Sequence, residues 1–232
     1  MLTANYTWSH EIDQGAAGGG DSDYPGNPAC LACERASGDY DARQVFTANA
    51  VYDMPFRSGG SALSSLARLV HAAFGNWSLS PIVTARTCLP INATEDRSST
   101  SVATGYTTSQ RPNRVPGVSL SPPGGPQRGE WINPAAFSLV AGSGYGDAPR
   151  NVARGPGLWQ ADLALSKQVH LSESAQLRFR CEFFNAFNRA QYGLPLSDFS
   201  TSSFGQILNT VNTGPVSTGT PRQIQLSVRL QF

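Results

Sequence analysis

Apolar and polar residues alternate one by one in about six segments of this chain. The last of these segments runs from Arg222 to Phe232 and reads RQIQLSVRLQF, with an apolar residue at every second position from Ile224 onward. Because successive side chains of a β-strand point to opposite faces, this alternation predicts strands with one apolar and one polar face. The predicted strands lie near residues 1–9, 43–53, 76–87, 159–169, 175–187 and 222–232.

The connections between these predicted strands differ in length. Three are long, near 10–42, 88–158 and 188–221, and two shorter ones alternate with them. If consecutive strands run up and down, all three long connections fall at one end, as in outer-membrane barrels with short periplasmic turns and long extracellular loops. The pattern favours an all-β fold in which antiparallel up-and-down strands form part of a transmembrane β-barrel. A secreted or surface-attached β-sandwich used for binding or adhesion is the alternative, because its strands alternate too.

Composition agrees with a chain of many strands and turns. Charged residues make up only 14% of the sequence, which also contains 23 glycines and 16 prolines. The formal net charge of +1 gives no electrostatic reason to expect nucleic acid as a partner. Apolar runs are shorter than the roughly 18 residues of a membrane-spanning helix. The stretch after Met1 lacks the features of a signal peptide, which predicts either a cytosolic protein or a piece of a longer chain.

Several stretches in both halves of the chain are similar to sequences of one known family. The C-terminal half contains RGPGLWQADLALSK, FRCEFFNAFN and the terminal PRQIQLSVRLQF, and the N-terminal half contains LTANYTWSHEID and GNWSLSPIVTARTCLPI. Together these stretches resemble the C-terminal part of the barrel of TonB-dependent outer-membrane receptors, most closely that of the Oar-like group, whose members carry a carboxypeptidase-regulatory-like domain at the N-terminus. The resemblance covers most of the chain and is weakest near 89–130.

This resemblance implies a location in the outer membrane of a Gram-negative bacterium and a part in TonB-dependent uptake of an unidentified ligand. A complete receptor has a signal peptide, a TonB box, a plug domain and a barrel of about 22 strands. An open sheet would leave unpaired strand edges in lipid. We therefore expect 1–232 to be the C-terminal part of such a barrel and not competent alone. The implied partners are outer-membrane lipid, the plug and missing strands of the receptor, the TonB system through that plug, and the barrel-assembly machinery.

Charged residues stand in the middle of the last two predicted strands, on their polar face. They are Arg178, Arg180, Glu182 and Arg229. In a barrel we expect them to face the water-filled lumen, either as a ladder of charge pairs or as contacts for a passing ligand. The terminal Phe232 resembles the C-terminal aromatic that the barrel-assembly machinery reads, and it also suits an interfacial aromatic girdle.

Two cysteines form a CxxC motif in the first long connection. For Cys30 and Cys33 we expect a local loop disulfide, with free thiols or metal and redox chemistry as the alternatives. The motif has no second cysteine pair and no nearby histidine, so it is a weak zinc signal. The histidines His10, His71 and His170 are scattered and lack the spacing of a metal or catalytic motif. We therefore expect no enzyme activity, metal or cofactor.

Overall fold

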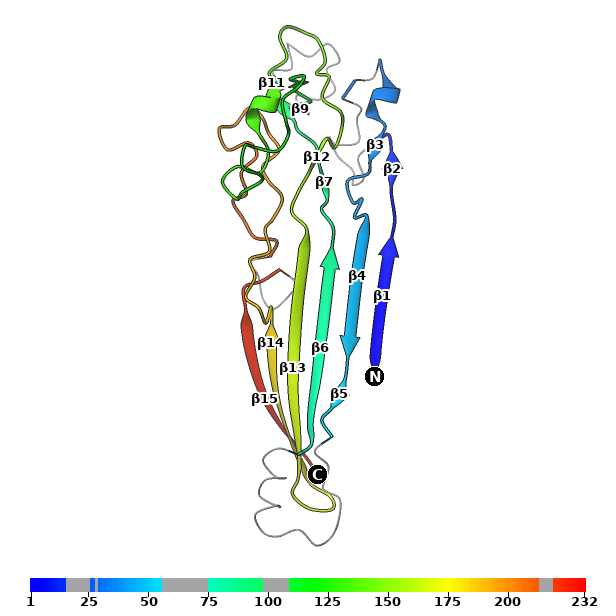
Figure 1. The fold of residues 1–232 in the computed structure, drawn as a ribbon, viewed down its shortest axis with the longest axis vertical. Coiled ribbons are helices and arrows are strands. Elements are labelled where there is room, and N and C mark those ends of the chain that lie inside the picture. The colour runs from blue at the N-terminus through cyan, green and yellow to red at the C-terminus, as the bar shows by residue number, and fades with distance from the viewer. Residues whose placement is uncertain (16–25, 28, 56–74, 98–108, 213–218) are drawn as a thin grey trace.

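A single antiparallel sheet runs along the long axis of the computed structural model, which describes residues 1–15, 26–27, 29–55, 75–97, 109–212 and 219–232 (Figure 1). Its strands are β1 (Leu2–Trp8), β4 (Gln44–Ala50), β5 (Tyr52–Asp53), β6 (Trp77–Arg86), β13 (Leu158–His170), β14 (Gln176–Phe184) and β15 (Gln223–Gln231). They lie side by side in the order β1-β4-β6-β13-β14-β15, with β5 also paired to β6. Because neighbours in the sheet follow chain order and pair antiparallel, the predicted up-and-down, all-β fold class is confirmed.

The strand predicted over 43–53 is divided in two in the structure. β4 pairs with β6 as far as Asn49, opposite Ile82, and β5 resumes in the same register with Tyr52 opposite Leu79. The gap lies where this register faces Pro81, which has no N–H to donate to the ladder. β6 itself stays continuous through the proline because β13 pairs with all of it on the other side.

Strand register gathers the apolar residues of the sheet on one side, here called the apolar face. Leu163 of β13 lies opposite Phe183 of β14, which in turn lies opposite Ile224 of β15. On the next row toward the lower end, Leu165 lies opposite Cys181, which lies opposite Leu226. A register shift of one residue would turn every side chain of a strand to the other face, so the pairing itself makes the apolar surface continuous.

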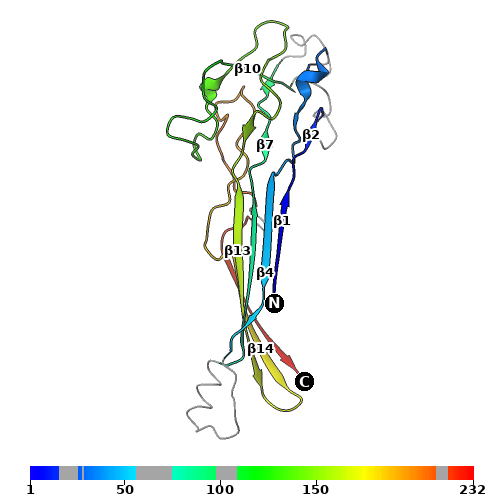
Figure 2. The same ribbon diagram turned by 45° about the vertical axis from the view of Figure 1, so that its right-hand side comes forward.

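The three long connections meet at the same end of the sheet, as predicted. Figures 1 and 2 show them together above the strands, whereas the short turn between β13 and β14 lies at the lower end. We call the described residues of 9–43, 87–157 and 185–222 the head. Parts of the predicted loops, 16–25, 28, 98–108 and 213–218, lie outside the described residues. No helix in the described part of the chain is long and apolar enough to cross a membrane.

The head contains short regular elements that the sequence pattern did not predict. Its ladders pair β2 (Ile12–Asp13) with β3 (Ala36–Ser37), β7 (Pro90–Ile91) with β12 (Ala153–Arg154), β8 (Glu95–Asp96) with β9 (Ser109–Gln110), and β10 (Asn113–Arg114) with β11 (Phe137–Ser138). Two 3₁₀ helices, η2 (Leu31–Glu34) and η3 (Pro134–Ala136), complete it. Each ladder is only two residues long, too short to leave a periodic signal in the sequence.

The buried apolar core of the described residues lies in the head, and the sheet contributes little to it. The cluster consists of Ile91, Ala93, Ile132, Ala136, Phe137, Ala148, Ala153 and Phe204. The rings of Phe137 and Phe204 meet edge to face, with centroids 5.4 Å apart. Gly205, at a φ of 75°, accepts hydrogen bonds from the backbone N–H groups of Trp131 and Ile132. An added Cβ there would collide with the Ile132 carbonyl, so glycine lets the second and third long connections pack together.

Candidate functional site

Aromatic side chains border the apolar face of the sheet at both ends. In the row nearest the head, Tyr6 lies opposite Phe46, Phe46 lies opposite Ala85, and Ala85 lies opposite Trp159. These aromatic rings are exposed, with Tyr6 at 62% and Trp159 at 37%. At the lower end, the ammonium group of Lys167 lies 4.9 Å from the ring centroid of Trp77.

The spacing of the two aromatic borders is close to the height of the apolar band of outer-membrane barrels. Trp159 and Lys167 lie on the same strand, about 27 Å apart at the usual rise of a β-strand. If the strand is tilted by about 40° from the membrane normal, as in outer-membrane barrels, this length spans about 20 Å of depth. The apolar band of such barrels is about 25 Å tall. The apolar face therefore has the height and the borders of a lipid-facing surface.

The opposite side of the sheet, here called the polar face, carries hydroxyl, amide and charged groups. Ser166 of β13 lies opposite Arg180 of β14, which lies opposite Ser227 of β15. Closer to the head, Gln160 lies opposite Thr84. No second sheet covers either face among the described residues.

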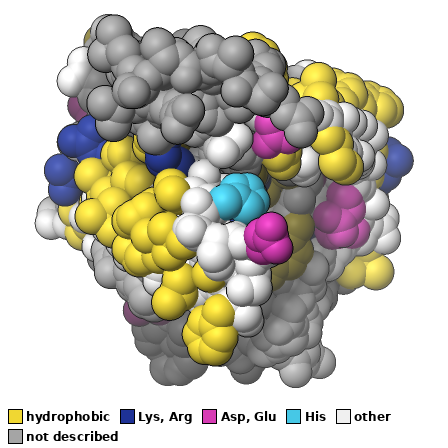
Figure 3. Space-filling model, turned by 90° about the horizontal axis from the view of Figure 1, so that it is seen from below, with side chains coloured by type: hydrophobic (Ala, Val, Ile, Leu, Met, Phe, Trp, Pro, Cys, Tyr) yellow, Lys and Arg dark blue, Asp and Glu magenta, His cyan; other side chains and the backbone are white. Residues whose placement is uncertain are grey.

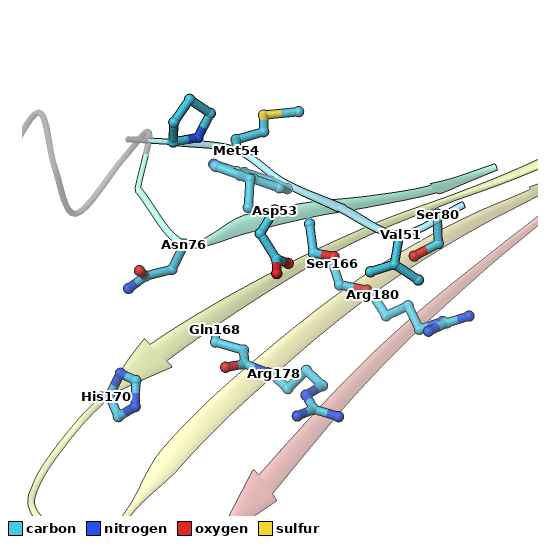
Figure 4. Close-up of a pocket in the computed structure, with 13 residues that line it drawn as sticks. Val51, Asp53, Met54, Asn76, Ser80, Ser166, Gln168, His170, Arg178 and Arg180 are labelled. Atoms are coloured by element: carbon cyan, nitrogen blue, oxygen red, sulfur yellow. The ribbon is translucent and has the colours of Figure 1, made fainter. Parts of the chain in front are cut away.

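A cavity of about 830 Å³ opens on the polar face near its lower end (Figure 4). It lies between the β5–β6 edge and strands β13 and β14, and its polar lining includes Asp53, Ser166, His170, Arg178 and Arg180. Seen from below, this end of the molecule shows apolar side chains on one part of its surface, with histidine, acidic and basic side chains beside them (Figure 3). The cavity can therefore accommodate a polar group of either charge, with arginine as its main cation.

The four charged residues predicted to face the lumen all lie on the polar face, and they interact in two ways. The Nη2 group of Arg180 donates a hydrogen bond of 2.8 Å to Oε1 of Glu182. Arg178 lies directly opposite Arg229, and neither forms an ion pair with a carboxylate of the described residues. Of the expected ladder of charge pairs, only Arg180 and Glu182 form a pair. Arg178 and Arg229 are like charges directly opposite each other, an arrangement that destabilises a sheet.

His170 belongs to the cavity although the predicted strand over 159–169 stops one residue before it. It is the last residue of β13 and lines the cavity together with Gln168. The alternation of β13 could have predicted this position, because the same period that puts Ser166 and Gln168 on the polar face also puts His170 there. The strand ends one residue later than predicted, and this residue carries the imidazole.

A comparison with protein families decides which solvent the two faces meet. A family model described as an outer membrane beta barrel domain matches residues 1–225. The chain belongs to this family. Its location is therefore the outer membrane of a Gram-negative bacterium. No curated protein and no solved structure matches the chain.

Membership of an outer-membrane barrel family assigns lipid to the apolar face and the lumen to the polar face. Barrel strands of this kind alternate between lipid-facing and lumen-facing residues, with aromatic girdles at both interfaces. Trp159 and Trp77 then lie near the two interfaces, and Arg178 and Arg180 lie on the opposite, polar face, where they line the cavity. A β-sandwich would instead bury the apolar face against a second sheet.

Ion pairs with at least one buried partner each join the first long connection of the head to the second. Arg111 binds Glu34 through both terminal guanidinium nitrogens, at 2.5 and 2.8 Å, and both side chains are buried. Arg154 donates to Asp41 at 3.0 Å, and Arg150 forms ion pairs with Asp13 and Asp39, the latter at 3.3 Å. Sequence reasoning missed these contacts because the partners are far apart in the chain, 77 residues for Arg111 and Glu34.

Cys30 and Cys33 are joined by a disulfide in the structure, with their Cα atoms 5.4 Å apart. The bridge spans the start of η2, whose last residue is the buried Glu34. The two other cysteines, Cys88 and Cys181, are free thiols. The bridge therefore braces the short helix that presents Glu34 to Arg111.

Two carboxylates of these ion pairs, Asp41 and Glu34, have shifted pKa values, as does Glu95, which pairs with Arg97 elsewhere in the head. Burial raises the pKa of Asp41, but hydrogen bonds from Arg154, the backbone of Glu11 and Arg43 outweigh it and lower that pKa to about 2. Burial likewise raises the pKa of Glu34, and the hydrogen bond and charge of Arg111 bring the net value below the usual range. Glu95 behaves differently, because burial raises its pKa more than its backbone hydrogen bond from Val140 and the charge of Arg97 lower it.

We expect acid to loosen the head before it affects the sheet. A carboxyl group whose pKa is lowered by folding adds stability above its unfolded pKa and loses that contribution as the pH falls through the folded pKa. For Asp41 the loss falls between about pH 4 and about pH 2, and Glu34 changes in the same direction. Glu95 opposes them, because a raised pKa favours the folded head at low pH.

The measurement is amide hydrogen exchange at about pH 5 and about pH 2.5, with protection corrected for the intrinsic rate. Protection around Ile91 and Ile132 should fall while that of β13 and β14 is retained. An Asp41→Asn variant should show a smaller difference between the two pH values. Equal protection of the head at both would contradict the prediction.

Proposed function

We propose that this chain forms the C-terminal wall of a TonB-dependent outer-membrane receptor and takes part in the uptake of a ligand. The observation that carries the proposal is the division of one sheet into an apolar and a polar face beneath a folded head. Membership of the outer-membrane barrel family supports it. The receptor assignment itself rests on the resemblance of RGPGLWQADLALSK, FRCEFFNAFN and the terminal strand to the Oar-like group.

In this proposal each part of the chain has a separate task. The head, which we place outside the cell because long barrel loops are extracellular, makes the first contact with the ligand. The polar face, with Arg178 and Arg229, lines the path through the lumen. The plug and the TonB system supply the gate and the energy. The proposal assigns the chain no catalytic step and no cofactor.

The two edge strands of the sheet require further strands in this arrangement. Among the described residues, β1 pairs only with β4, and β15 pairs only with β14. A free strand edge in lipid would leave backbone N–H and C=O groups without partners, at a cost of several kcal/mol each. We assign these missing neighbours to the remainder of the receptor barrel. The alternative of a β-sandwich is not favoured, because no described element covers the apolar face.

Cross-linking in the native host tests the TonB dependence. We expect the protein to fractionate with the outer membrane and formaldehyde to capture it together with an energy-transducing protein of the inner membrane. Dissipating the proton gradient should change the yield of this cross-linked product. A barrel that reaches the outer membrane in normal amounts but never yields the product would overturn the receptor assignment and leave the family membership intact.

For Phe232 we propose a role in barrel assembly. The residue follows β15, lies at the lower end of the sheet and is 96% exposed (Figure 1). We expect Phe232→Ala to lower the amount of protein recovered in outer-membrane fractions and Phe232→Tyr, which keeps the aromatic ring, to leave it near the wild-type level. If the alanine variant assembled as well as wild type, the aromatic terminus would not be needed for assembly.

A further inference from the structure

An exposed arginine lies on a tryptophan at the border between the apolar face and the head. The guanidinium carbon of Arg189 is 5.4 Å from the ring centroid of Trp159, and the ring of Phe187 is 5.7 Å from the same tryptophan. Phe187 is 70% exposed. Because Trp159 belongs to the row of aromatics on the apolar face, this group of side chains lies on the outer surface of the barrel, at the interface nearest the head.

The backbone of a second exposed arginine is hydrogen-bonded to the residue that precedes the first. The backbone N–H of Arg222 donates to Oδ1 of Asn188, the residue before Arg189, at 3.2 Å. Arg222 lies just before β15, and the alternation of that strand, extended back by one residue, puts Arg222 on the same side as Ile224, the lipid side. Among the described residues neither arginine forms an ion pair, so two positive charges stand uncompensated on this part of the outer surface.

Two buried amides hold this group of side chains in place. Oδ1 of Asn185 accepts from the backbone N–H of Arg189 at 3.0 Å, and Nδ2 of Asn185 donates to the backbone carbonyl of Arg189 at 2.8 Å. Oε1 of Gln191 accepts from the backbone N–H of Trp159 at 3.3 Å. Both amide side chains belong to residues that are 1% exposed. The positions of Trp159 and Arg189 are therefore set by buried hydrogen bonds, as in a preformed binding site.

The chemistry of the group matches a lipid phosphate. Guanidinium groups bind phosphate oxygens in bidentate fashion, tryptophan prefers the interface between hydrocarbon and headgroups, and basic clusters at that level recognise anionic headgroups. The head marks the extracellular end, so the group lies at the outer leaflet. In a Gram-negative outer membrane that leaflet consists of lipopolysaccharide, whose lipid anchor carries phosphate groups. An acyl chain can then lie along the apolar face beneath Phe187.

We propose that Trp159, Phe187, Arg189 and Arg222 form an outer-surface site for the phosphate groups of lipopolysaccharide. The site rests on the proposed function for the extracellular placement of the head, but not for TonB-dependent uptake. Lys167 provides a matched comparison, because its ammonium group also lies over a tryptophan but at the opposite interface, where it donates to the carbonyl of Gly75 at 3.3 Å.

The test measures lipopolysaccharide binding by the protein extracted from outer membranes in a nonionic detergent. Wild type should bind intact lipopolysaccharide at least tenfold more tightly than lipopolysaccharide from which the lipid phosphates have been removed. The reason is that each arginine near a phosphate should increase the affinity roughly fivefold. The double variant Arg189→Gln with Arg222→Gln should lose this preference. Lys167→Gln should bind within about twofold of wild type. Circular dichroism of each variant shows whether it is folded.

Three results would overturn the proposal. One is a folded double variant that binds intact lipopolysaccharide as tightly as wild type. Another is equal binding of the intact and dephosphorylated lipids by wild type. The third is displacement of lipopolysaccharide by inorganic phosphate at equal phosphate concentration, which would mean a site for free anions. If the double variant does not fold, the variant Arg189→Lys tests the proposal instead. It keeps the positive charge but loses the bidentate contact with phosphate, so it should weaken binding of intact lipopolysaccharide several-fold.

Discussion

Substituting Ile224 by arginine should destabilise the folded barrel by about 2–4 kcal/mol, the cost of a basic side chain facing lipid at the bilayer midplane. Ile224 is 58% exposed and lies in the row of Leu163 and Phe183, midway between the two aromatic borders of the apolar face. The expected loss is large because hydrocarbon cannot hydrate the guanidinium group at this depth. The measurement is reversible unfolding in guanidinium chloride with the protein inserted in lipid vesicles.

The next residue provides the control for this substitution. Gln225 is also exposed, but its side chain lies on the polar face opposite Glu182. An arginine there meets water and a carboxylate, so Gln225→Arg should change the free energy of unfolding by only about 0.5 kcal/mol or less. Equal losses for the two variants, or a larger loss for Gln225→Arg, would mean that the apolar face does not meet lipid.

Replacing Arg111 by methionine should destabilise the head by roughly 3–5 kcal/mol, because it leaves the carboxylate of Glu34 buried without its partner. The Glu34 side chain is 2% exposed and is otherwise held by the backbone N–H of Asn27 at 3.0 Å. Loss of the pair should loosen the first long connection around Glu34, while the pairs of Arg150 and Arg154 still join it to the second. Hydrogen exchange of residues 29–41, compared with that of β13 and β14, measures this local loss of stability.

A double variant separates the cost of the unpaired charge from that of the lost contact. Glu34→Gln combined with Arg111→Met removes both charges, and its stability should lie closer to wild type than that of Arg111→Met alone. Unchanged exchange in Arg111→Met, or a double variant that is less stable than the single one, would show that the ion pair does not hold the connections together.

The ion pairs and the core hold the described parts of the three long connections together. Because Glu34, Asp41 and their arginines fix the first connection to the second, and Gly205 joins the third to the second, the three connections form one unit. Such a unit presents a defined surface at one end of the sheet. Its stability comes from its own core, so the head can differ from the sheet in its response to acid.

The sequence by itself determined the strands of the sheet and their two faces. Alternation is a property of neighbouring residues, and a strand reproduces it directly because its side chains point to opposite faces in turn. The stretch 222–232 therefore predicted β15 to within one residue at each end, and the positions of Arg178 and Arg229 on the polar face followed from the same period. The fold class and the gathering of the long connections at one end could be inferred in the same way.

Only the tertiary structure decided the contacts between residues distant in the chain. The pairing of Glu34 with Arg111 depends on how two connections cross, which no local pattern encodes. The same holds for Arg189, which reaches Trp159 through the turn after β14, and for His170, which enters the cavity because β13 extends to it. Secondary structure follows from neighbours in sequence, whereas ion pairs, the head core and the interface arginines depend on backbone paths that are set by packing and register.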